Sequence, residues 1–285
     1  MPKKPPKLPQ RLRSGVTKRL ELEYEQAIRK AVSHILPPKG STPDLQAWID
    51  HILSKENSPY VQKLTDALAG RMVRWVEIDN ARTWREAAAR SQKSRMLYRL
   101  LQREMAGPVG QRVRELVAEN ARLIRSIPLD AAQTTAHEIM RLQQMGARPK
   151  TIERALRVKF PQHTAAKIRL IARTETMKAS AALTETRATH LGIRWYMWRT
   201  SEDQRVRKSH AHMDGVLIPY SQPPAPEKLV GIKSTLGAYH AGEAPNDRCV
   251  QLPLLDPDDV SWPHKVYWNG RISIMTRAQF VRLGV

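Results

Sequence analysis

The chain has 285 residues, a formal net charge of +21 and a pI near 10.5, so its field attracts polyanions such as nucleic acid or an acidic protein surface. Its single cysteine excludes an intrachain disulfide and a zinc site made of cysteines alone. No apolar run approaches the roughly 18 residues that a membrane helix needs, and we expect no membrane partner.

The first segment, residues 1–18, is rich in proline and lysine. No apolar segment or small-residue cleavage site follows it, which argues against a secretory signal. We therefore predict a solvated basic arm on a protein that is made in a cytoplasm-like compartment.

Residues 19–161 are predicted to form a helical, arginine-rich region. Apolar residues recur there at helical spacing, and proline or glycine separates the periodic segments. The Thr-Pro-Asp sequence at 42–44 predicts a helix start, whereas Pro128 and Gly146 predict breaks. The predicted helices cover about 20–35, 45–52, 59–105, 110–126, 129–145 and 149–160.

The positive charge is concentrated in this part of the chain. Residues 1–165 hold 31 Lys+Arg and 16 Asp+Glu, which leaves the other 17 and 11 of the 48 and 27 to residues 166–285. We expect each arginine of the 59–105 helix to be solvated and often to pair with Glu77, Glu86 or Glu104 at nearby spacing. Together they are candidate contacts for double-stranded DNA of any sequence or for a protein partner: Arg71, Arg74, Arg82, Arg85, Arg90, Arg95, Arg99 and Arg103.

Residues 162–285 are predicted to form a small α+β domain with a short antiparallel sheet, which makes the whole chain α+β. A helix over 162–190, ended by Gly192, comes first. An Asn-Gly pair at 269–270 predicts a type I′ hairpin turn, and Thr276 predicts the cap of a terminal helix. The predicted strands are 193–199, 216–218, 249–254, 265–268 and 271–275, with a short helix near 203–212 and an ordered loop over 221–246.

Polar residues are densest at 198–215, directly after an aromatic strand. On a helix that starts near Asp203, Arg207 lies one turn further on, and His210 follows three residues later on the same face. Because a carboxylate accepts two parallel bonds from a guanidinium, we expect these three residues, together with Arg205, to form an internal polar network. Its predicted role is structural: it holds the 162–190 helix against the sheet.

Three chemical alternatives use the same residues. His210, His212, His240 and Cys249 are a zinc ligand set by type, but their spacing matches no familiar zinc pattern, and we expect no metal and no other cofactor. A nuclease or phosphodiesterase would use His210 as general base with Arg205 and Arg207 on the phosphate, although no second acid or carboxylate cluster accompanies them. Cys249 as a nucleophile would need one of the same histidines as base.

The order of five separated elements resembles the phage Mu F-like head-morphogenesis family, the minor head proteins of tailed phages. The resemblance covers roughly residues 165–255. The elements are Ala172-Arg173-Thr174-Glu175, the aromatic strand at 195–198, Asp203-x-Arg205-x-Arg207-x-x-His210, Asp214-Gly215 and Pro245-x-x-Arg248-Cys249.

The resemblance implies a virion component present in few copies, associated with the portal or inner capsid and involved in head assembly, DNA packaging or DNA delivery. Family members carry both Arg173 and Glu175, which are therefore expected to join the polar network, as are Asp214, Arg248 and Cys249. Family members often have two cysteines that flank the arginine of the last element. Here Asp247 stands at the first of these positions, which weakens any cysteine-pair metal or disulfide role.

We therefore predict a structural phage head protein rather than an enzyme, located in the virion and made in the host cytoplasm. Its expected partners are the portal protein, the major capsid protein and, without sequence preference, double-stranded DNA, and self-association is left open. The alternatives are a phage-encoded nuclease or phosphodiesterase that uses the His210/Arg207 cluster, and a basic adaptor for cellular nucleic acid. The adaptor is the weakest, because the chain has no helix-turn-helix, zinc-finger or RNA-binding signature.

Overall fold

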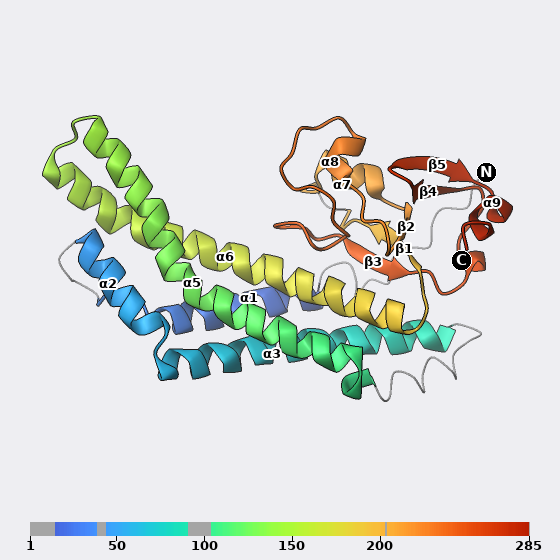
Figure 1. Cartoon of the computed structure of the whole chain (residues 1–285), viewed down its shortest axis with the longest axis horizontal. Coiled ribbons are helices and arrows are strands. Elements are labelled where there is room, and N and C mark those ends of the chain that lie inside the picture. The colour runs from blue at the N-terminus through green and yellow to red at the C-terminus, as the bar shows by residue number, and fades with distance from the viewer. Residues whose placement is uncertain (1–14, 39–43, 91–103, 203, 285) are drawn as a thin grey trace. The chain divides into compact units, whose positions relative to one another are not determined.

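A computed structural model describes residues 15–38, 44–90, 104–202 and 204–284 (Figure 1). Long helices fill the first part of the chain, and a five-stranded sheet with short helices fills the last part, which confirms the predicted α+β class. The chain forms two compact units. We call Arg19–Arg74 with Arg114–Glu175 the helical unit, and the unit built mainly from Trp75–Val113 and Thr176–Val285 the sheet unit.

The long helices begin and end largely where the local sequence predicts. The Asp44 carboxylate accepts hydrogen bonds from the first-turn amides of the second helix, and Gly192, at φ +74°, follows the end of the longest one. The helices are α1 (Gly15–Val32), α2 (Leu45–Glu56), α3 (Pro59–Arg90), the 3₁₀ turn η2 (Glu104–Ala106), α5 (Pro108–Gln144) and α6 (Pro149–His190).

Two predicted breaks at proline are wrong. Pro128 lies inside α5, and Pro161 lies inside α6, which therefore crosses the predicted domain boundary at 161/162 as one helix. A proline removes one helical hydrogen bond and crowds the carbonyl four residues earlier. In α5 that loss is offset by burial on both sides of the proline, because Ile124, Ile127 and Ala131 are almost completely buried.

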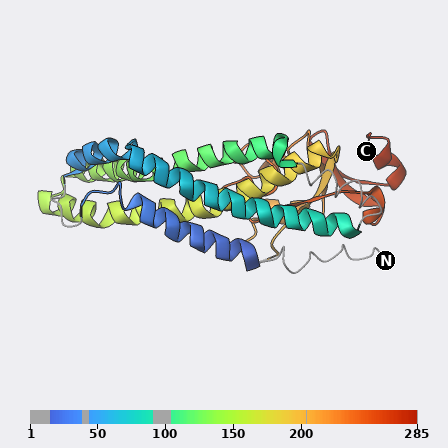
Figure 2. The ribbon, with the colours of Figure 1, turned by 90° about the horizontal axis from the view of Figure 1, so that it is seen from below.

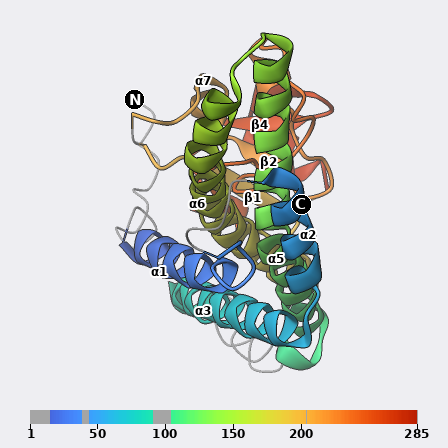
Figure 3. The same ribbon diagram turned by 90° about the vertical axis from the view of Figure 1, so that its left-hand side faces the viewer.

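The core of the helical unit lies among α2, α3, α5 and α6, which Figures 2 and 3 show from two sides. Ile52 of α2, Val61 of α3 and Ala131 of α5 are buried together with Phe160 of α6. The Phe160 ring lies 5.3 Å from the ring of Trp48. Side chains far apart in sequence thus hold these helices together.

The sheet has the spatial order β3-β1-β2-β4-β5, and its pairs are antiparallel except for the parallel pair β2–β4. β1 is buried along its whole length because its side chains alternate between two apolar clusters. Tyr196 and Trp198 enter one cluster, and Trp195 and Met197 enter the other. The strands are β1 (Trp195–Arg199), β2 (Leu217–Pro219), β3 (Val250–Pro253), β4 (His264–Trp268) and β5 (Arg271–Met275).

Short helices connect and follow the strands. They are α7 (Lys208–Met213), α8 (Pro226–Leu229), the 3₁₀ turn η3 (Pro257–Asp259) and α9 (Arg277–Val281). The predicted hairpin is confirmed, since Asn269 and Gly270 both have positive φ. The predicted cap is also confirmed, because Thr276 forms a capping box with Gln279. Within the described residues, no helix is long and apolar enough to span a membrane.

A buried ion-pair network in the sheet unit was not foreseen. Arg187 of α6 is 1% exposed, and its guanidinium donates to both Glu104 oxygens, at 2.9 and 2.7 Å, and to Glu77 at 2.9 Å. It also contacts the Asn80 side-chain oxygen, and Asn80 in turn donates to Thr184 at 2.7 Å. Glu77 and Glu104 therefore pair across the fold with Arg187, a partner that the sequence-based expectation of pairing with nearby arginines did not include.

Candidate functional site

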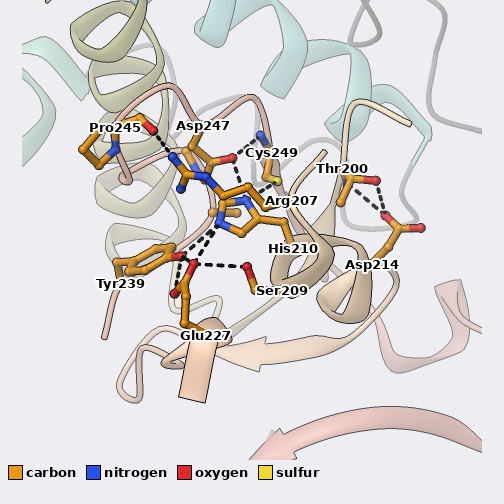
Figure 4. A network of polar contacts seen from close by, with 12 residues as sticks. Thr200, Arg207, Ser209, His210, Asp214, Glu227, Tyr239, Pro245, Asp247 and Cys249 are labelled. Atoms are coloured by element: carbon orange, nitrogen blue, oxygen red, sulfur yellow. Dashed lines mark hydrogen bonds and ion pairs between the residues drawn. The ribbon is translucent and has the colours of Figure 1, made fainter. Parts of the chain in front are cut away.

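The polar site of the sheet unit is assembled from three segments that converge on one imidazole (Figure 4). His210 lies on α7, Glu227 on α8, Tyr239 in the following loop, and Asp247 and Cys249 in the segment that leads into β3. All five residues are buried, and we call them the His210 cluster. The short α7 and α8 place their polar side chains inward because Met213 and the loop residues around them are packed on the aromatic face of β1.

One ring nitrogen of His210 faces both a carboxylate oxygen and a sulfur atom. Its Nδ1 lies 3.1 Å from Asp247 Oδ1 and 3.3 Å from Cys249 Sγ. Asp247 is held in place by the chain itself, since the amides of Cys249 and Gly242 donate to its two oxygens at 2.8 Å each. The carboxylate therefore cannot turn away from the imidazole without leaving buried amides unpaired.

The other ring nitrogen faces a second carboxylate through a phenol. His210 Nε2 lies 2.9 Å from the Tyr239 hydroxyl, which donates to Glu227 at 2.8 and 2.9 Å. Ser209 also donates to Glu227. With Glu227 as a carboxylate, the one phenolic hydrogen of Tyr239 is directed at Glu227, so Nε2 carries the hydrogen in its contact with Tyr239. Both ring nitrogens are thus engaged inside the protein.

The electrostatics of the cluster keep Asp247 charged and Cys249 neutral. Burial alone would raise the pKa of Asp247, but the hydrogen bond and charge of His210 and the bonds from Cys249 outweigh it and hold the pKa below its usual 3.8. Burial, and after it the Asp247 charge, raises the pKa of the Cys249 thiol far above its usual value. An activated cysteine nucleophile requires the opposite shift.

The predicted network is only partly what the structure contains. The predicted helix near 203–212 begins at Lys208, so Arg207 is its N-cap and does not share a helical face with His210. Arg207 Nη2 instead donates to the Pro245 carbonyl at 2.6 Å, while Arg205 is exposed. Asp203 lies outside the described residues.

The remaining predicted members occupy other places. Asp214 accepts from the Thr200 amide at 2.9 Å and lies 3.4 Å from Arg199, which fixes the turn after β1. Arg248 is half-buried beside Cys249 in the chain. Arg173 and Glu175 belong to the helical unit, where Arg173 donates to Glu21 at 2.8 Å and Glu175 is buried.

The geometry bears on each of the three chemical alternatives: the zinc site, the nuclease base and the cysteine nucleophile. Of the four residues proposed as zinc ligands, His210 and Cys249 lie together, His212 is exposed, and His240 contacts the Tyr196 hydroxyl. As a nuclease base, His210 would need a free ring nitrogen near solvent, but its ring is buried and both nitrogens are occupied. In a nucleophilic triad the acid and the thiol contact different ring nitrogens, whereas Asp247 and Cys249 both face Nδ1.

Sequence reasoning missed Glu227 and Tyr239. Both come from the Pro- and Gly-rich segment 221–246, which was predicted only as an ordered loop. The local sequence carried no signal for these two residues, because the same segment also contains Lys228, Lys233, His240 and Glu243. No spacing rule joins them to His210, because the contacts depend on how the loop folds back.

His240 forms a second buried cluster on the aromatic face of the sheet. Its Nδ1 lies 3.1 Å from Tyr196 Oη, and its amide donates to Glu243 at 2.6 Å. Burial lowers the pKa of His240 below 6.5, although Glu243 and a hydrogen bond to the Tyr220 backbone act in the opposite direction.

This shift predicts a loss of stability on mild acidification. Below pH 6.5 the unfolded chain binds a proton at His240 that the folded chain binds only at lower pH, so the free energy of unfolding falls as the pH drops toward the lowered pKa. Thermal melts of the full chain between pH 7 and 5 should show this decrease, and His240→Asn should flatten it. Burial, and after it Glu243, raises the pKa of Glu185, so the contribution of Glu185 to stability grows as the pH falls. Glu185 is present in both proteins, and its contribution therefore cancels when their pH profiles are compared. Parallel pH profiles for the two proteins would contradict the prediction.

The structure describes the side chains of four of the eight arginines that are predicted to contact DNA. Arg71, Arg74, Arg82 and Arg85 are exposed on α3, and Arg82 pairs with Asp79. At 100° per residue their spacing places all four on one side of that helix. Arg90 is in α3, but its side chain is outside the described part, as are Arg95, Arg99 and Arg103 altogether.

Comparison with known proteins identifies the segment that carries the His210 cluster. The family described as "Phage Mu protein F like protein" matches residues 133–252. This segment is phage Mu F-like. The match confirms the resemblance inferred from the sequence, and it begins earlier than predicted, within α5.

The chain also has a curated relative. An uncharacterized protein of Haemophilus influenzae (strain ATCC 51907 / DSM 11121 / KW20 / Rd) is 34% identical over 152 residues, which are 53% of this chain and 31% of the relative. This chain therefore spans less than a third of that protein's length. No solved structure matches the chain. The phage Mu F-like match supports a phage head-related protein.

Proposed function

We propose that the protein is a minor head protein of a tailed phage, a structural virion component that acts in head morphogenesis at the portal or the inner face of the capsid. The observation that carries this proposal is the phage Mu F-like match over residues 133–252. The geometry of the His210 cluster supports a structural rather than a catalytic role, because its imidazole is buried and engaged on both nitrogens.

Particle composition tests this function. Mass spectrometry of purified phage particles should detect peptides of this protein at a low ratio to the portal protein and far below the major capsid protein. Particles that package DNA and infect normally without the protein, or particles that never contain it, would refute the proposal. A cleavage activity on DNA or RNA that depends on His210 would favour the nuclease alternative instead.

The proposal includes non-specific contact with double-stranded DNA during packaging or ejection. It is supported by the net charge of +21 and by the exposed arginines of α3. Such contact displaces counterions from phosphates and leaves no sequence preference. The proposed protein partners are the portal and the major capsid protein.

Binding to an arbitrary duplex should therefore be strongly salt-dependent. A protein that makes several phosphate contacts loses about 10³- to 10⁵-fold in affinity between 50 and 200 mM salt, which fluorescence anisotropy with a labelled duplex would measure. Replacing Arg71, Arg74, Arg82 and Arg85 together with alanine should reduce the slope of log K against log salt by up to about 4.

A charge-matched control separates the α3 face from net charge alone. Arg122, Arg141, Arg148 and Arg154 are also exposed, and their replacement with alanine removes the same formal charge from other helices and a loop. This control should change the slope much less. Equal effects of the two sets would mean that α3 is not the contact face, and equal affinity at both salt concentrations would remove the DNA contact from the proposal.

A further inference from the structure

The His210 cluster presents three different metal-ligand atoms at one point. His210 Nδ1, one Asp247 carboxylate oxygen and Cys249 Sγ all lie within 4.8 Å of one another, and all three residues are buried. Among the described residues this is the one group of histidine, cysteine and acidic side chains with such proximity. We infer that these three side chains bind a single Zn²⁺ ion, independently of where the protein acts.

Two of the three separations between ligand atoms fit tetrahedral zinc with little movement. Bonds of about 2.0–2.3 Å to nitrogen, oxygen and sulfur place neighbouring ligand atoms roughly 3.3–3.8 Å apart in a tetrahedron. Nδ1 lies 3.1 Å from Asp247 Oδ1 and 3.3 Å from Cys249 Sγ. Opening these separations by a few tenths of an ångström makes room for the ion, and a water molecule completes the fourth position.

The partners behind the ligands are already placed as a zinc site requires. A zinc-bound histidine donates its other N–H to an oxygen, which fixes its tautomer and ring orientation. Here Nε2 faces the Tyr239 hydroxyl at 2.9 Å, and Glu227 accepts from that hydroxyl. Because the Nε2 hydrogen stays directed at Tyr239, loss of the Nδ1 hydrogen leaves a lone pair on Nδ1 for the metal. The amides of Cys249 and Gly242 hold Asp247 in the same way.

An unpartnered indole points to a thiolate at the same place. Trp198 is completely buried, and its Nε1–H makes no full hydrogen bond with any described residue. The indole lies in the same buried cluster as Cys249. An N–H donor beside a zinc-bound thiolate stabilises the negative charge that metal coordination produces.

The donor set selects zinc over the common hard cations. Mg²⁺ and Ca²⁺ prefer oxygen ligands only, whereas one imidazole, one carboxylate and one thiolate suit a borderline ion. Binding replaces the hydrogens of Nδ1 and Sγ with one divalent cation, so two protons leave to solvent for each ion bound. With the Asp247 and Cys249 charges, the bound site is neutral overall.

The site ties α7 to the segment before β3. His210 comes from the first, and Asp247 and Cys249 come from the second, so the ion cross-links two stretches of chain that β-sheet hydrogen bonds do not join directly. The aspartate at 247 thereby supplies a ligand within the chain's Asp-Arg-Cys sequence. This assigns a binding role to the only cysteine of the protein.

Cobalt substitution tests the site directly. The full-length protein is stripped with a chelator and titrated with Co²⁺, whose thiolate complexes show a charge-transfer band in the near ultraviolet. We expect this band to saturate at about one equivalent, to disappear on addition of Zn²⁺ and to be absent in Cys249→Ala. His212→Ala, which removes an exposed histidine two residues from His210, is the matched control and should retain the band.

A second variant probes the indole. Trp198→Phe keeps an aromatic ring but removes the N–H, and it should weaken Co²⁺ binding about 10- to 100-fold while the band remains. If Cys249→Ala does not fold, the wild-type spectrum still decides, because the charge-transfer band requires the one thiolate of the chain. The absence of a band in folded wild-type protein, or an unchanged band in folded Cys249→Ala, would overturn the inference.

Discussion

Replacing Arg187 with alanine is expected to lower the free energy of unfolding by about 3–5 kcal/mol, because it leaves buried carboxylates without their partner. Arg187 is 1% exposed and makes a two-pronged contact with Glu104. Glu77 and Asn80 bind the same guanidinium. Removing it therefore leaves at least one buried charge uncompensated in a medium that solvates it poorly.

Urea unfolding followed by circular dichroism would measure this change. The matched control is Arg82→Ala, which removes an arginine that pairs with Asp79 on the surface of α3. An exposed pair of this kind contributes about 0–1 kcal/mol. Equal losses for the two variants would show that the Arg187 network is not the buried charge cluster described above.

A conservative variant refines the result. Arg187→Lys keeps the charge but cannot form two parallel bonds with one carboxylate, so it should recover only part of the lost stability. If Arg187→Lys is as stable as the wild type, then the positive charge at position 187, and not the two parallel hydrogen bonds of the guanidinium, stabilises Glu104.

Replacing His210 with alanine is expected to cost about 2–4 kcal/mol, measured with a chelator present so that only the hydrogen bonds contribute. The change removes the donor to Asp247 and the partner of Tyr239 in one step. Both partners are buried, so leaving them without His210 carries the desolvation cost of an unmade hydrogen bond. His212→Ala, an exposed neighbour, should change stability by no more than about 0.5 kcal/mol.

The same variant separates the structural proposal from the nuclease alternative. Under the structural proposal, His210→Ala melts at a lower temperature and the wild type has no nucleic-acid cleavage to lose. Under the nuclease alternative, the variant keeps the wild-type melting temperature but loses a measurable cleavage. A thermal melt combined with a cleavage assay on single- and double-stranded substrates distinguishes the two.

The elements of this fold that depend on local chemistry were predictable. The Asn269-Gly270 turn, the Thr276 cap and the Gly192 helix end all follow from backbone preferences of single residues. Pro128 and Pro161 were misread for the same reason, since the local rule ends a helix at proline. In both places burial of apolar neighbours outweighs one lost hydrogen bond.

The candidate site was predictable only in part. His210 and Cys249 stood out because both lie within the phage Mu F-like pattern and Cys249 is the only cysteine of the chain. The predicted partners Asp203 and Arg207 followed from assumed helical spacing, but α7 begins too late for Arg207 to share its face with His210. Glu227, Tyr239 and Asp247 reach His210 from 17 or more residues away through loop geometry, which no periodic pattern encodes.

The sheet unit is built from segments that are far apart in the sequence, which affects how the chain folds during its synthesis on the ribosome. Glu77 precedes Arg187 by 110 positions, and the whole of Arg114–Glu175 is made in between. At a synthesis rate of about 5–20 residues per second, Arg187 is added roughly 5–20 s after Glu77. During that interval Trp84 lacks its buried partners, because Trp198 and the other residues of its apolar cluster are made later.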